Sequence, residues 1–79
     1  MTDNEKAVMT DCYKLLNTYS NPPAKNDAKC DEYWNNLTNE AIQISENHKQ
    51  HPLAVEVGSA ILSYLQKKWH AINRKKGLE

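Results

Sequence analysis

The sequence predicts an all-α fold, an up-down-up antiparallel three-helix bundle, from three observations. Apolar residues recur at helical spacing in three stretches, two proline-containing segments separate these stretches, and no stretch alternates apolar and polar residues as a strand does. A chain of 79 residues has room for one core, so we expect a single domain over residues 1–77. Short connections make successive helices antiparallel neighbours.

The first helix is expected at about residues 2–20. Thr2 and Glu5 have the spacing of a capping box, in which each side chain bonds to the backbone N–H of the other residue. The segment SNPPAKND ends this helix, because prolines lack an N–H donor and disfavour helical geometry in the residue before them. The expected core stripe is Val8, Met9, Cys12, Leu15, Leu16 and Tyr19.

The second helix is expected at about residues 27–47, with Asn26 or Asp27 as its N-cap. Its expected core stripe is Cys30, Tyr33, Trp34, Leu37, Ala41 and Ile44. Ile42 lies off this stripe and is left without an obvious place in the core.

The third helix is expected at about residues 52–76, after the break ENHKQHP. Pro52 suits a first helical turn, where its missing N–H would be unpaired anyway, and Gly77 suits the left-handed residue that ends many helices. Gly58 is expected to allow the close approach of another backbone. The apolar face is the widest of the three: Leu53, Ala54, Val57, Ala60, Ile61, Tyr64, Leu65 and Ile72.

The sequence shows neither a signal peptide nor a membrane-spanning segment, which indicates a cytoplasmic protein. The first residues lack the basic start and apolar stretch of a signal peptide, and no apolar run is long enough to span a bilayer. In a reducing compartment, Cys12 and Cys30 are expected to be small buried residues without a disulfide. The last two residues, Leu78 and Glu79, match the remnant of an expression vector and are given no functional weight.

The spacing of the reactive residues argues against catalysis. About 18 helical residues separate Cys30 from His48, or about 27 Å, which is too far for one zinc ion. His48 and His51 are interpreted as solvated loop histidines, and Cys12 as an inert thiol in an apolar stripe. The chain has no glycine-rich phosphate loop. We therefore expect no enzyme, and no catalytic residue, metal site or cofactor.

A basic stripe near the C-terminus raises the alternative of nucleic-acid binding. Its members share one side of the third helix and are Lys67, Lys68, Arg74 and Lys75. The chain as a whole has ten basic and ten acidic residues and no net charge, and helix dipoles favour cations at this position. The expected role is local neutralisation of the acidic start of the second helix, which carries Asp27, Asp31 and Glu32, with Trp69 packed inside the bundle.

A row of apolar residues spaced by seven lies at the edge of the face of the third helix. The row is Val55, Leu62 and Trp69. One interpretation is that a central helix touches two others and needs so wide a face. The other is that the row forms, with Ile42, part of a homodimer or partner surface, because large exposed apolar residues reduce solubility unless something covers them.

The segments NEKAVMTDCYKLLNTYSN, EYWNNL and VGSAILSYLQKK together resemble a group of small helical proteins. These are encoded in prophages and conjugative elements of low-GC Gram-positive bacteria, and no functional residues have been assigned in the group. The resemblance implies an accessory protein of a mobile element that acts through contacts. The predicted function is thus a non-enzymatic protein-interaction module, with nucleic-acid binding as the alternative.

Overall fold

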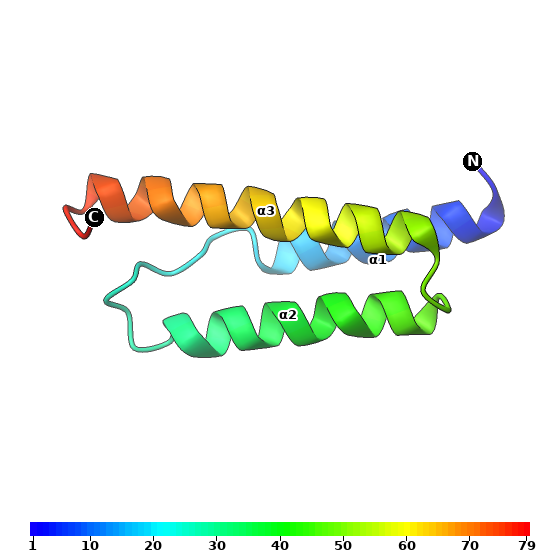
Figure 1. The fold of residues 1–79 in the computed structure, drawn as a ribbon, viewed down its shortest axis with the longest axis horizontal. Coiled ribbons are helices and arrows are strands. Elements are labelled where there is room, and N and C mark those ends of the chain that lie inside the picture. Colours follow the sequence, from blue (N-terminus) through cyan, green and yellow to red (C-terminus); the bar gives the residue numbers. More distant parts are fainter.

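The protein is a bundle of three helices packed side by side (Figure 1). The computed structural model describes all 79 residues, and the helices are α1 (Asp3–Thr18), α2 (Cys30–Asn47) and α3 (Pro52–Lys75). Each helix contacts both of the others, and the bundle measures 45 × 20 × 16 Å. The chain runs up, down and up, so the predicted fold class is confirmed. None of the three helices is both long and apolar enough to cross a membrane.

Helix α1 begins with the predicted capping box. The Glu5 N–H donates to Thr2 Oγ1 at 3.1 Å, and the Thr2 N–H donates to Glu5 Oε1 at 2.7 Å. The hydrogen bonds from Thr2 lower the pKa of the Glu5 carboxyl, because they favour its charged form. Both hydrogen bonds of this helix end therefore join residues within one turn, as the sequence predicts.

Helix α2 begins at Cys30, three residues later than predicted, and the expected cap at Asn26 or Asp27 is wrong. Its N-cap residue is Lys29, whose side chain makes no capping hydrogen bond. The Asp27 carboxylate instead accepts the Lys29 N–H at 2.8 Å, two residues on, and the Asp27 carbonyl accepts the Cys30 N–H at 3.1 Å. A short aspartate side chain often forms such a local turn in competition with a helix.

Helix α3 begins at a histidine cap that the sequence did not reveal. His51 Nδ1 accepts the Leu53 N–H at 3.1 Å, and Pro52 occupies the first helical turn as predicted. His48, at the end of α2, lies 2.7 Å from the Asp11 carboxylate of α1. Neither histidine is a solvated loop residue, because one caps a helix and the other joins two helices. Gly77 follows α3 with φ of 72°, as expected of a helix-terminating glycine.

The core contains residues from all three predicted stripes. Seven buried residues form one cluster: Val8, Cys12, Leu15, Leu37, Ala54, Ile61 and Leu65. Three residues of the predicted stripes are exposed instead, namely Met9, Ala60 and Tyr64. Met9 is 39% exposed and Tyr64 is 54% exposed. Met9 lies at the margin of its stripe, where a side chain runs along the outer surface of the bundle. Tyr64 lies inside its stripe, and its polar hydroxyl suits an exposed position.

The segment between α1 and α2 is held against the bundle by three polar side chains. Asn73, which is completely buried in α3, accepts the Lys25 N–H on its Oδ1 atom at 2.8 Å. Lys68 Nζ donates to the Ser20 carbonyl, and the Tyr33 hydroxyl donates to the Tyr19 carbonyl. Burial raises the pKa of Tyr33 to about 12, so this donor keeps its proton well above neutral pH.

Candidate interaction surface

A shallow groove runs between α2 and α3 on the outside of the bundle. Its volume is about 200 Å³. Helix α2 provides one wall and α3 the other, and the lining residues are Thr38, Ala41, Ile42, Ser45, Ala54, Val55, Gly58, Ser59 and Leu62. Ile42 and Val55 are the large apolar residues most exposed here, at 52% and 47%. The groove therefore presents two apolar side chains to whatever meets this face.

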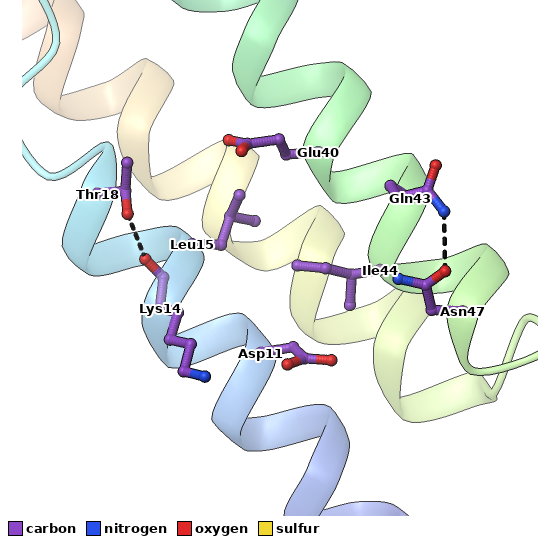
Figure 2. Close-up of a pocket in the computed structure, with 8 residues that line it drawn as sticks. All are labelled: Asp11, Lys14, Leu15, Thr18, Glu40, Gln43, Ile44 and Asn47. Carbon is purple, nitrogen blue, oxygen red and sulfur yellow. Dashed lines mark hydrogen bonds between the residues drawn. The ribbon is translucent and has the colours of Figure 1, made fainter.

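The groove is the one hollow of the molecule without a charged residue in its lining. The hollow between α1 and α2, in contrast, is lined by charged residues. There Asp11 extends from α1 toward α2 and Glu40 extends from α2 toward α1 (Figure 2). Charged residues are depleted from the centres of protein–protein interfaces, because both partners must lose water there. The absence of charge thus distinguishes the α2–α3 groove as a candidate contact surface.

The structure divides the apolar row that the sequence singled out. Ile42, Val55 and Leu62 all line the groove, and Leu62 also packs against the core. Trp69 does not line it. Its ring packs edge-on against Trp34 of α2 with 5.7 Å between the ring centroids. Three of the four candidate residues are therefore brought together, and the fourth joins α2 to α3 inside the bundle.

Gly58 lies in the groove and corrects one prediction. No backbone approaches it, because a Cβ atom built on this residue would meet nothing within 4 Å beyond its own helix. The expected close approach within the monomer is therefore wrong. Gly58 lines the groove, although the residue itself is buried.

Small polar residues line the groove at helical spacing, together with the apolar ones. Thr38, Ile42 and Ser45 are spaced i, i+4, i+7 on α2, and Val55, Ser59 and Leu62 have the same spacing on α3. These positions share one side of their helix and are free of charge. Because Thr38, Ser45 and Ser59 are polar, hydrophobicity alone does not reveal this stripe, whereas the lack of charge does.

The predicted basic patch is present, but its cations are not neutralised by direct pairing. Lys67, Arg74 and Lys75 are exposed, whereas Lys68 is partly buried and bonds to the Ser20 carbonyl. Both ion pairs of the structure involve a histidine, so no lysine or arginine pairs directly with a carboxylate. The acidic start of α2 lies at the same end of the bundle, as expected, without forming ion pairs (Figure 1).

The two cysteine side chains both lie in the interior of the bundle. Cys12 is buried in the core, and burial, with a smaller effect of the Asp11 charge, raises the pKa of its thiol. Cys30 is also buried, and neither cysteine forms a disulfide. No three residues among the histidines, cysteines and carboxylates are grouped closely enough to hold a metal ion.

Comparisons with known proteins found no relative of this chain. No protein-family model, no curated protein and no solved structure matches the chain.

Proposed function

We propose that this protein is a small non-enzymatic interaction module that binds another protein chain through the α2–α3 groove. The observation that carries the proposal is the charge-free groove with Ile42 and Val55 exposed on its opposite walls. A cytoplasmic location and a role as an accessory protein of a mobile element fit the composition and the resemblance in sequence. They belong to the same proposal.

A second apolar surface is the alternative site for such contacts. Met1, Met9 and Tyr13 are exposed on the outer side of α1 and its N-terminal extension, beside Lys6. This surface is built from one helix alone and includes a charged residue, whereas the groove lies between two helices. The groove is therefore a better binding site for a helix or loop of a partner than the surface on α1.

Site-specific photo-crosslinking in the native host cells tests the proposal. A photoreactive amino acid at Ile42 is expected to give a covalent adduct with a protein partner, and the same group at Tyr13, which is 71% exposed, is expected to give none. A second change, Val55→Asp, places a charge on the opposite wall and should abolish the adduct at position 42. Adducts at Tyr13 and not at Ile42 would move the site to α1, and adducts at neither position would contradict the proposal.

The unpaired cations near the end of α3 favour nucleic-acid binding as a second candidate function. Titration of labelled DNA and RNA at low salt checks it. Binding through Lys67, Arg74 and Lys75 should weaken steeply with salt, because neutralised phosphates release counterions. Each Lys→Ala change should reduce the salt slope by about 1. Absence of binding at low salt would remove this candidate.

A further inference from the structure

We infer that the segment between α1 and α2 is a strap that opens and closes as one unit over the ends of α2 and α3 while the three helices stay folded. The strap comprises residues 20–29, between the C-cap of α1 and the start of α2. In Figure 1 it leaves α1 near the middle of the bundle and runs to the end that holds the C-terminus. The inference goes beyond the proposed function and does not depend on the α2–α3 groove.

The strap contributes little to the core. Only Pro22 and Ala24 of the strap are buried, and neither belongs to the core cluster. Residues 25–29 are all exposed. The helices, in contrast, place large residues such as Leu37 and Leu65 completely inside. A segment with few buried apolar contacts opens at a lower free energy than the core, so the strap is expected to open before the helices separate.

Two hydrogen bonds join the strap to α3, and in both of them the group on α3 is a side chain. Lys68 Nζ donates to the Ser20 carbonyl, and Asn73 Oδ1 accepts the Lys25 N–H at 2.8 Å. Lys68 is only partly buried, so water replaces its partner when the strap opens, and a hydrogen bond exchanged for one to water contributes little net stability. Asn73 is completely buried and its Nδ2 atom has no partner, so opening lets water reach both ends of this amide.

Two prolines couple these two hydrogen bonds. Pro22 and Pro23 lie between Ser20 and Lys25, and their rings fix φ at both positions and restrict the residue before each. The stretch between the two bonded residues is therefore stiff, and a displacement at Ser20 is passed on to Lys25. We expect both bonds to break in one opening event.

The residue before the strap is a fixed point. The Tyr19 side chain packs against the core, and its ring meets that of Tyr33 edge-on with 5.4 Å between the centroids. The Tyr19 carbonyl also accepts the Tyr33 hydroxyl. Because α2 holds Tyr19 in these ways, the movement is confined to the strap and does not extend into α1.

The two cysteines of the chain report on two different openings. Cys30 is the first residue of α2, directly after the strap, and it is buried outside the core cluster. Cys12 is buried inside that cluster. Strap opening is expected to uncover the Cys30 thiol, whereas the Cys12 thiol becomes accessible only when the helices separate.

Pulse labelling of the folded chain with N-ethylmaleimide, followed by peptide mass spectrometry, measures the two thiols separately. Each rate is divided by the rate of the same thiol in the urea-unfolded chain. We expect Cys30 to be protected, but at least about tenfold less than Cys12. Labelling of Cys30 should also rise less steeply with urea, because strap opening exposes less surface than unfolding. Equal protection of both thiols with the same urea dependence, or no protection of Cys30, would overturn the inference.

Lys68→Met tests whether the strap moves as one unit. The variant keeps an apolar side chain and removes the donor to Ser20, without changing the groups that bond at Lys25. We expect exchange of the Lys25 amide and labelling of Cys30 to accelerate together by roughly two- to tenfold, which corresponds to the loss of one net hydrogen bond. Labelling of Cys12 should stay the same.

Thr10→Ala is the matched control, because it removes a side-chain hydrogen bond to the Lys6 carbonyl within α1. It should accelerate neither exchange of the Lys25 amide nor labelling of Cys30. In Lys68→Met, unchanged exchange at Lys25 would show that the two bonds break separately. Equal acceleration at Cys12 and Cys30 would show that Lys68 supports the whole bundle. Either result would overturn the strap as an independent unit.

Discussion

Leu65→Ala is expected to destabilise the bundle by about 2–5 kcal/mol. Leu65 is completely buried in the core cluster, so the change removes apolar contacts and leaves a cavity among residues of all three helices. A domain of this size typically has a free energy of unfolding of about 4–12 kcal/mol, so a large share of it would be lost. The urea midpoint should fall, and the melting temperature should drop by more than about 10 °C.

Tyr64→Ala is the matched control, one residue away on the same helix. Tyr64 is 54% exposed, so the change should alter stability by no more than about 0.5 kcal/mol. The pair of variants also checks the rotation of α3 about its axis. Equal losses for the two variants would mean that α3 presents a different face to the core.

Asn73→Ala is expected to destabilise the protein by about 1–3 kcal/mol and to loosen the segment between α1 and α2. The variant removes the acceptor of the Lys25 N–H, and with it one of the hydrogen bonds that join this segment to α3. Asn73 Nδ2 is buried without a partner, so its removal offsets part of the loss.

Hydrogen exchange gives a local measurement of the same change. The Lys25 amide should exchange much faster in Asn73→Ala, whereas amides in the middle of α2 should change only with global stability. Asn35→Ala, at an exposed position on α2, is the control and should leave the Lys25 amide protected. Unchanged protection of Lys25 in Asn73→Ala would show that other contacts hold the segment.

The helices were predictable because their signals are local. The capping box at Thr2 and Glu5, the proline at Pro52 and the glycine at Gly77 act within one turn of the chain, and all three have their predicted roles. The apolar period then placed Leu15, Leu37 and Leu65 in the core. The start of α2 was misjudged because Asp27 has two local options, a cap or a turn, and the sequence does not choose between them.

The candidate surface was predictable only in part. The surplus of Ile42, Val55 and Leu62 was visible in the helical period, and the structure places these three residues in one groove. Trp69 has the same spacing but packs against Trp34. The period gives the direction of a side chain from its own helix, and it does not say whether a neighbouring helix lies there to cover it.

Sequence alone was enough for the helical class, the order of the helices and most of the core, because these depend on periodicity and on end signals that act over a few residues. Tertiary structure decided which residues of the predicted stripes are exposed, as with Met9 and Tyr64, and which polar residues are buried, as with Asn73. It also decided that His51 caps α3 and that His48 meets Asp11. Each of these depends on a contact between residues or on the exact path of the backbone. The pattern of residue types along one helix specifies neither the contacts with other helices nor the path of the backbone.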